Sequence, residues 1–122
     1  MSDLSYEGRT VFCRDVPAAA RFYEDVLGFQ RYSEGGGDIG LRLPVVGDPN
    51  ASVTFYLHPA DAPEPVDLGT FRVSDVAAFL DTLRAAGHPV LADPTDTPWG
   101  VREASIRDPE GNGLLITSPI TG

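Results

Sequence analysis

The chain contains no lysine and a single cysteine, Cys13, among its 122 residues. All nine basic residues are arginines, and 18 acidic residues outweigh them to give a formal net charge of −9. Such a surface repels phosphate backbones, and no cluster of arginines offsets it, so we expect no binding to nucleic acid. An acidic surface attracts cationic partners, although it also serves simple solubility.

Long apolar segments are missing as well. No apolar run approaches the roughly 18–20 residues that span a bilayer, and residues 1–10 lack the basic start and apolar block of a secretory signal. A single cysteine cannot form an internal disulfide. The lack of such a disulfide is typical of proteins in reducing compartments. We therefore expect a cytoplasmic protein with no membrane partner. The apolar fraction of 42% predicts an ordinary globular protein rather than a disordered chain.

Apolar periodicity predicts the same succession of elements twice. Strands are expected at 9–14, 29–34, 38–44 and 51–59 in the first half, and at 68–74, 88–93, 101–108 and 113–119 in the second. A helix follows the first strand of each half. The first is capped by Asp15 and closed by Gly28, and the second begins at Ser74 or Asp75 and ends at Gly87.

The two halves also resemble each other in sequence, because "CRDV" at 13–16 is repeated as "VSDV" about sixty residues later. Neither half is large enough to bury a core alone. We therefore predict one domain, residues 1–122, made of two βαβββ modules at about 5–58 and 67–119. A proline-rich linker, 59–66, joins them.

Three segments, in this order, resemble the vicinal oxygen chelate superfamily: "RDVPAAARFYEDVLGF" (14–29), "TPWGVR" (97–102) and "DPEGNG" (108–113). That superfamily includes glyoxalase I, extradiol dioxygenases and bleomycin-resistance proteins. The resemblance covers nearly the whole chain. It implies an α+β fold in which the two modules form a curled mixed sheet, a cup, with helices on its outer face. It also implies a homodimer with ligand crevices between the subunits.

In the metal-using members, the resemblance implies that four His, Glu or Gln side chains inside the cup hold one divalent ion. Three of the corresponding positions here are Gly8, Leu68 and Leu115, whose side chains have no donor atom. The fourth position falls among residues 54, 56 and 58, where His58 is one candidate ligand. One imidazole does not make a metal site, so we expect neither a metal nor a cofactor.

Strand alternation, together with the place of each segment in the family, predicts which side chains line the cup. The expected ligand-binding residues are Phe12, Thr54, Tyr56, His58, Arg72, Trp99 and Leu115. Three of them offer rings for stacking on flat ligands, and Arg72 offers a partner for an anionic or carbonyl group. Each also has a structural reading: the rings as core, interface or loop-filling residues, Arg72 as a solvated charge, and His58 as a structural or exposed residue.

These features favour a metal-independent small-molecule binding protein of the bleomycin-resistance type, which sequesters a cationic or aromatic natural product such as an antibiotic. The alternative is a metal-dependent, glyoxalase-like lyase or isomerase, or a dioxygenase, with a displaced ligand set. The spare donors for such a set are Glu34, Asp38, His58 and Glu103, which lie on different strands and which no sequence pattern brings together. A metal-free enzyme using a tyrosine or arginine, and an accessory subunit, also remain open.

Overall fold

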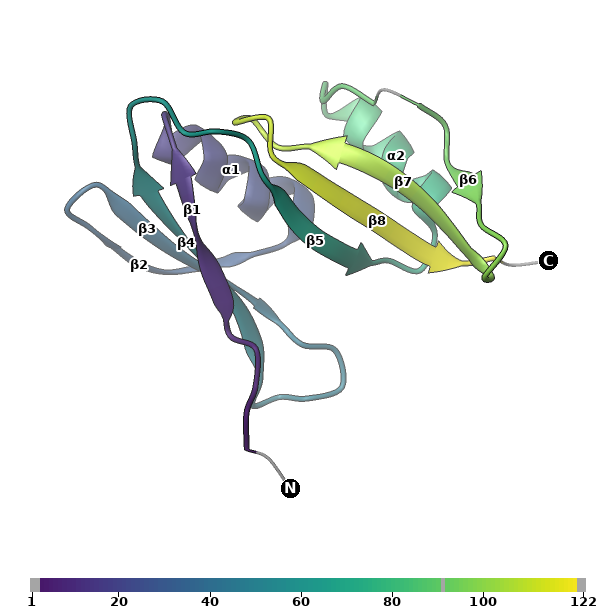
Figure 1. The fold of residues 1–122 in the computed structure, drawn as a ribbon, viewed down its shortest axis with the longest axis horizontal. Coiled ribbons are helices and arrows are strands. Elements are labelled where there is room, and N and C mark those ends of the chain that lie inside the picture. The colour runs from purple at the N-terminus through teal and green to yellow at the C-terminus, as the bar shows by residue number, and fades with distance from the viewer. Residues whose placement is uncertain (1–2, 91, 121–122) are drawn as a thin grey trace. The chain divides into compact units, whose positions relative to one another are not determined.

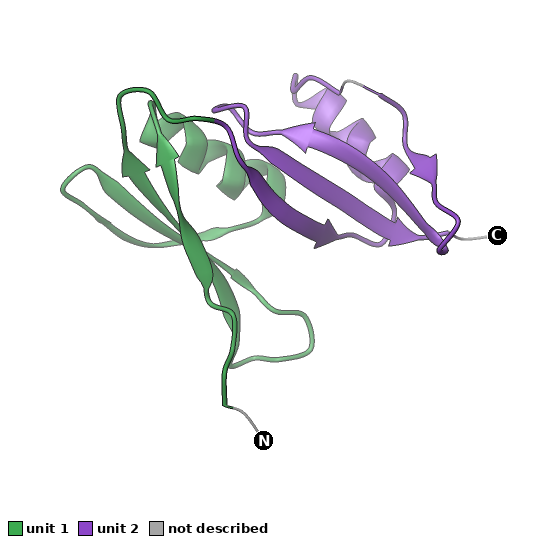
Figure 2. Cartoon of the chain, in the orientation of Figure 1, with its two compact units in different colours: residues 1–64 green, residues 65–122 purple. Residues whose placement is uncertain are grey.

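The computed structural model describes residues 3–90 and 92–120. The chain divides into two compact units, residues 1–64 and 65–122, and the boundary falls inside the proline-rich segment 59–66 (Figure 2). Within the described residues, no helix is both long and apolar enough to cross a bilayer. That the two units act as a single domain stays a prediction.

The first unit is built as β-α-β-β-β (Figure 1). Its elements are β1 (Gly8–Cys13), α1 (Val16–Leu27), β2 (Gln30–Gly35), β3 (Asp38–Pro44) and β4 (Ser52–Pro59). The sheet order is β1-β4-β3-β2, with β1 parallel to β4 and the other neighbours antiparallel. Gly36 and Gly37, with φ of 63° and 87°, make the tight turn between β2 and β3, since glycine adopts positive φ without steric cost.

Helix α1 starts and stops where its sequence predicts. The Asp15 carboxylate accepts a hydrogen bond from the Ala18 backbone N–H at 3.1 Å, and Gly28 ends the helix in the left-handed conformation with φ of 77°. The buried side of the helix packs into an aromatic core. The Tyr23 ring lies edge-on to Phe29 and Phe55 at centroid distances of 5.4 and 5.5 Å.

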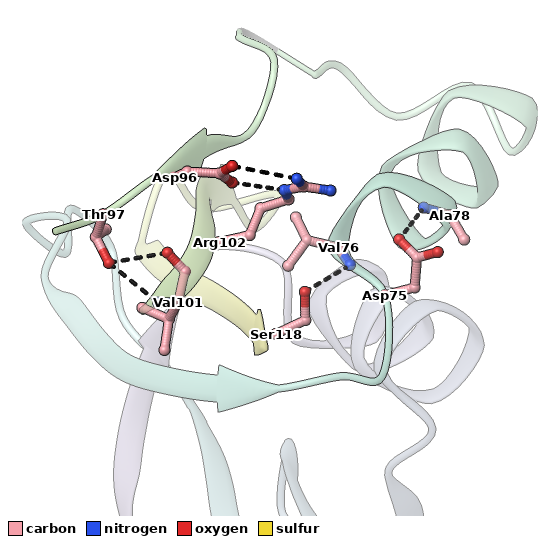
Figure 3. Close-up of polar contacts among 8 residues, drawn as sticks. All are labelled: Asp75, Val76, Ala78, Asp96, Thr97, Val101, Arg102 and Ser118. Atoms are coloured by element: carbon pink, nitrogen blue, oxygen red, sulfur yellow. Dashed lines mark hydrogen bonds and ion pairs between the residues drawn. The ribbon is translucent and has the colours of Figure 1, made fainter. Parts of the chain in front are cut away.

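The second unit repeats the order with β5 (Asp67–Arg72), α2 (Val76–Ala85), β6 (Thr95–Asp96), β7 (Val101–Arg107) and β8 (Gly113–Pro119). Its sheet order is β5-β8-β7-β6, and only the β5–β8 pair is parallel. Asp75 caps α2 by accepting from the Ala78 N–H at 3.2 Å, and Ser118 Oγ accepts from the Val76 N–H at 3.1 Å (Figure 3). The core beneath α2 is aliphatic and includes Leu80, Leu83, Leu114 and Ile116.

The structure confirms the α+β class, the two βαβββ modules and a helix packed on each sheet. The strand predicted at 88–93 is wrong: residues 88–90, 92 and 93 are irregular, and position 91 lies outside the described residues. The short strand β6 comes after this segment instead. Pro89 and Pro94 explain the shift, because proline supplies no N–H to a sheet ladder.

The "DPEGNG" corner before β8 is held by a buried hydrogen-bond network. The Asp108 carboxylate, in a residue only 5% exposed, accepts from the backbone N–H groups of Glu110 at 2.9 Å and Asn112 at 2.8 Å. It also accepts from Asn112 Nδ2 at 2.9 Å, while Asn112 Oδ1 accepts from the Val66 N–H at 2.9 Å. The corner therefore ties the start of β8 to the residue that precedes β5.

Candidate functional site

One face of the first unit's sheet carries four of the predicted ligand-binding residues. Along β4, Phe55 and Leu57 are buried on the α1 side, whereas Thr54, Tyr56 and His58 alternate onto the opposite face. Phe12 of β1 lies directly opposite His58 on this face and is 51% exposed. The two rings meet edge to face with centroids 5.9 Å apart.

Strand β3 adds a carboxylate to this face. The Asp38 Oδ1 atom lies 2.7 Å from His58 Nδ1. Hydrogen bonding to Asp38 is the main cause that raises the pKa of Tyr56, with smaller contributions from desolvation and from the charges of Asp38 and Tyr32. One carboxylate thus influences both an imidazole and a phenol on a partly exposed surface.

A hollow of about 310 Å³ opens beside Tyr56 on the first unit. It is lined by Glu7, Gly8, Arg9, Thr10, Tyr32, Thr54 and Tyr56. Gly40 leaves room for the Tyr32 ring, because a Cβ at position 40 would overlap it. The guanidinium carbon of Arg42 lies 4.6 Å from the Tyr32 ring centroid, within cation–π range.

Sequence reasoning missed Tyr32 and Arg42 as parts of this face. The alternation in "DIGLRLP" (38–44) could have placed Asp38, Gly40 and Arg42 on one side of a strand. Tyr32 had no such signal, because the β2–β3 pairing shifts register between Arg31 and Ser33, and a shift of one residue moves a side chain to the other face.

The expectation that the four spare donors stay apart is wrong for Asp38 and His58, which are in contact. The other two do not join them. Glu34 forms an ion pair with Arg31 at 2.9 Å, and Glu103 belongs to β7 of the second unit. The missing information was the β3–β4 register, which brings the first residue of β3 next to the end of β4.

The remaining predicted residues belong to the second unit. Arg72 of β5 lies opposite Thr117 of β8, and Leu115 lies opposite Thr70 and is half-buried. Leu68, which the family resemblance places inside the cup, is 7% exposed, and the β5–β8 pairing is irregular between Asp67 and Thr70.

Trp99 is presented at the tip of the turn between β6 and β7. Thr97 closes this turn: its Oγ1 accepts from the Val101 N–H at 3.2 Å and donates to the Val101 carbonyl at 2.8 Å (Figure 3). Next to the turn, the Asp96–Arg102 ion pair, 2.6 Å between Oδ1 and Nε, lowers the pKa of Asp96. The Trp99 side chain is 72% exposed, so it does not fill its own loop.

The donors available on this chain do not fit a divalent ion at the family's metal positions. Gly8 lies opposite Thr54, and a Cβ at position 8 would overlap the Thr54 backbone, so no ligating side chain can stand there. Leu68 and Leu115 have hydrocarbon side chains. Across residues 3–90 and 92–120, no group of three or more His, Cys, Asp or Glu side chains is placed to hold a metal.

Comparison with known proteins gives one family and many shared folds. The family model for the Glyoxalase/Bleomycin resistance protein/Dioxygenase superfamily matches residues 8–116. Among solved structures, a glyoxalase/bleomycin resistance protein/dioxygenase from Nocardioides is similar with a TM-score of 0.75 and 20% identity, covering 100% of this chain and 87% of that one. No curated protein matches this chain in sequence.

Two other similar structures have more specific names. Lactoylglutathione lyase from Agrobacterium tumefaciens has a TM-score of 0.75 at 18% identity, covering 93% of this chain and 92% of its own. TioX from Micromonospora sp. ML1 has a TM-score of 0.73 at 20% identity, covering 95% and 99%. Similarity at this level of identity shows the shared fold alone.

Proposed function

The chain belongs to the glyoxalase/bleomycin resistance protein/dioxygenase superfamily, and from that premise we propose that it is a metal-independent protein that binds a small aromatic molecule, cationic by preference. Within that class we propose the sequestering role of the bleomycin-resistance type. The observation that carries the proposal is the hollow of about 310 Å³ on the first unit, whose walls include the Tyr32 and Tyr56 rings and the Thr10 and Thr54 hydroxyls.

The composition of this wall supports a flat ligand. Aromatic side chains provide area for stacking, and hydroxyls provide a few oriented hydrogen bonds, which is the usual make-up of a small-molecule site. Phe12 extends the aromatic surface beyond the hollow, since it packs against His58 with half of its own surface still exposed. On the second unit, described by itself, Trp99 is an exposed ring that we propose as a contact for a ligand bound there.

Charge supports a cationic group on the ligand. The net charge of −9 attracts cations over long range, and in the wall of the hollow Glu7 is balanced by Arg9. The Arg42 guanidinium on the Tyr32 ring illustrates how this face accommodates a positive charge. Arg72 remains our proposed contact for a carbonyl or anionic group, and Leu115 for an apolar one.

Calorimetric titration with bleomycin and with uncharged flat natural products tests the proposal. Trp99 is the only tryptophan of the chain, so quenching of its fluorescence reports whether a titrated compound contacts this ring. We expect Tyr56→Ala to weaken binding about tenfold, since an aromatic contact contributes roughly 1 kcal/mol beyond its area. The matched control is Tyr6→Ala, which removes a 69% exposed ring outside the hollow. Absence of binding to every compound of both classes would refute the proposal.

The alternative of a metal-dependent lyase, isomerase or dioxygenase has one observation in its favour, which is that Asp38 and His58 place two donors side by side. Metal analysis after incubation with Ni²⁺, Zn²⁺, Mn²⁺ or Fe²⁺ separates the two functions. One bound ion per chain, lost in both Asp38→Asn and His58→Gln, would favour the enzyme. The homodimer and the cytoplasmic location stay predictions, and sedimentation at several protein concentrations checks the first.

A further inference from the structure

The contact between Asp38 and His58 determines which ring nitrogen of His58 carries the proton. An ionised carboxylate only accepts hydrogen bonds, so Nδ1, at 2.7 Å from Oδ1, must be the donor. The neutral imidazole then has its lone pair on Nε2. The His58 side chain is 48% exposed, so it is open to a ligand or to water.

Burial of the carboxylate and a ring contact hold this arrangement in place. Asp38 is only 20% exposed at its side chain, which restricts the carboxylate. The Phe12 ring meets the imidazole edge to face, with an interplanar angle of 85°. An imidazole whose Nδ1–H is anchored by a carboxylate is the arrangement of a general base with a defined tautomer.

The pair stands next to the hollow and is linked to it through Tyr56. Tyr56 belongs to the wall of the hollow, and His58 follows two residues later on the same face. Two residues along a strand correspond to about 6.6 Å. A ligand whose ring lies beside Tyr56 therefore brings a substituent within reach of His58 when a few bonds join that substituent to the ring.

We propose that His58 is a general base oriented by Asp38, and that this face hydrolyses small aromatic esters and similarly activated carbonyl compounds. The proposal goes beyond sequestration and rests on the proposed function in one respect, which is that the ring of the substrate occupies the same hollow. Asp38 is a positioning residue in this scheme, and His58 is the group that contacts the reacting water.

The chemical step balances with water as the only co-reactant. His58 Nε2 takes a proton as the O–H bond of water breaks, and the oxygen pair forms a bond to the ester carbonyl carbon. The tetrahedral intermediate expels the aryloxide, which takes the proton from the imidazolium, and the products are a carboxylic acid and a phenol. The Asp38 carboxylate accepts the hydrogen bond from Nδ1–H and so stabilises the transient imidazolium.

Hydrolysis of p-nitrophenyl acetate, followed by release of p-nitrophenolate, tests the base. We expect His58→Gln to reduce the rate by about tenfold or more, at the lower end of what a positioned base contributes because the site is partly exposed. The control is His88→Gln, because His88 is the other of the two histidines of the chain and lies outside this face. Equal rates in His58→Gln and wild type, or equal losses in both variants, would overturn the proposal.

The role of Asp38 has a readout other than activity. Nitrogen-15 shifts of the His58 ring should show the Nδ1–H tautomer in the wild type, with a change toward the Nε2–H tautomer in Asp38→Asn, whose amide can donate to Nδ1. An Nε2–H tautomer in the wild type would overturn the assignment. If bleomycin binds but hydrolysis does not exceed the background rate, this inference alone is refuted. If hydrolysis requires His58 but none of the titrated compounds binds, the sequestering role alone is refuted.

Discussion

The two units have the same order of elements and nearly the same pairing, yet their cores and exposed sheet faces differ. In each unit the first strand pairs in parallel with the last, so Thr10 opposite Tyr56 corresponds to Thr70 opposite Leu115. At this equivalent position the first unit has a hydrogen-bonding aromatic ring and the second has an aliphatic side chain. Repetition of the backbone therefore does not carry the chemistry with it, and the chemistry must be argued residue by residue.

Two of the chain's three Asp-Pro pairs precede the last strand of a unit, and they differ in how firmly the turn is held. Asp48 and Pro49 lie in an exposed loop before β4, where the Asp48 carboxylate accepts one hydrogen bond, from the Asn50 N–H at 3.0 Å. Asp108 and Pro109 lie in the buried corner before β8, where the carboxylate accepts three. The unit with the less elaborate exposed face has the more firmly held corner.

The largest expected effect comes from the two cores. Phe55 and Leu114 occupy equivalent strand positions, and both are 1% exposed. Phe55→Ala should lower the free energy of unfolding by about 3–5 kcal/mol, and Leu114→Ala by about 2–5 kcal/mol, through lost burial and the cavity left behind. Phe55 should be the costlier because its ring also contacts Tyr23 and Phe29. Urea unfolding measures the cost.

Hydrogen exchange then shows where each cost falls. If the two units are separate in stability as well as in contacts, Phe55→Ala should speed exchange among amides of residues 3–64, and Leu114→Ala among those of residues 65–90 and 92–120. If exchange speeds up uniformly over both units in both variants, the chain unfolds as a single cooperative structure. The two units then have no separate stabilities to compare.

The next effect concerns the two Asp-Pro turns. Asp108→Ala should cost about 2–3 kcal/mol, because it leaves buried N–H groups of Glu110 and Asn112 without their charged acceptor. Asp48→Ala should change stability by no more than about 0.5 kcal/mol, since water replaces the carboxylate in an exposed loop. Chemical denaturation measures the free energy of unfolding of both variants. Similar losses in the two variants would mean that burial of the 108–113 corner contributes little to stability.

A smaller effect is expected where the two units are alike. Asp15 and Asp75 cap their helices through the same contact, at 3.1 and 3.2 Å. Replacing either with alanine should cost about 1 kcal/mol. Thermal unfolding measures both, and clearly unequal costs would show that the repeat differs even at its most similar point. Helix α2 has a further acceptor at its start, because Ser118 Oγ accepts from the Val76 N–H. Ser118→Ala removes this acceptor.

Features determined by local sequence could be predicted well. The caps at Asp15 and Asp75 and the stop at Gly28 depend on residues a few positions apart. The repeat revealed the βαβββ order. The error at 88–93 arose because "HPVLAD" has apolar residues typical of a strand, while Pro89 within it and Pro94 directly after it supply no N–H groups for pairing.

The site was predictable only in part, because its essential contact joins residues twenty positions apart. Alternation along β4 predicted that Tyr56 and His58 share one face, and the family resemblance predicted that this face lines the ligand-binding cup. The Asp38 contact depends on the β3–β4 register, and the position of Tyr32 depends on a bulge. Pairing register is set by packing of the whole sheet, which no local pattern specifies.

The smallest effect concerns the acid–base behaviour that distinguishes the two faces. Asp38 accepts the Tyr56 hydrogen bond and so raises the pKa of that phenol, because the interaction favours the neutral form in the folded state. Its contribution to stability is fully present below the ordinary tyrosine pKa of about 10 and is lost as pH rises through the higher folded value. In the second unit the lowered pKa of Asp96 gives the opposite sign: the contribution of its pair with Arg102 is present above about pH 4 and lost as pH falls.

Alkaline titration of phenolate absorbance, with Tyr56→Phe subtracted from wild type, isolates the Tyr56 transition. We expect Asp38→Asn to move this transition to lower pH, toward ordinary tyrosine, because the charged acceptor is gone. Tyr6→Phe serves as the control and should leave the Tyr56 transition in place, since Tyr6 lies 69% exposed near the N-terminus. An unchanged Tyr56 transition in Asp38→Asn would mean that the carboxylate does not hold the phenol. The hydrogen-bonded face of the first unit would then reduce to separate exposed rings, much like Trp99 in the second.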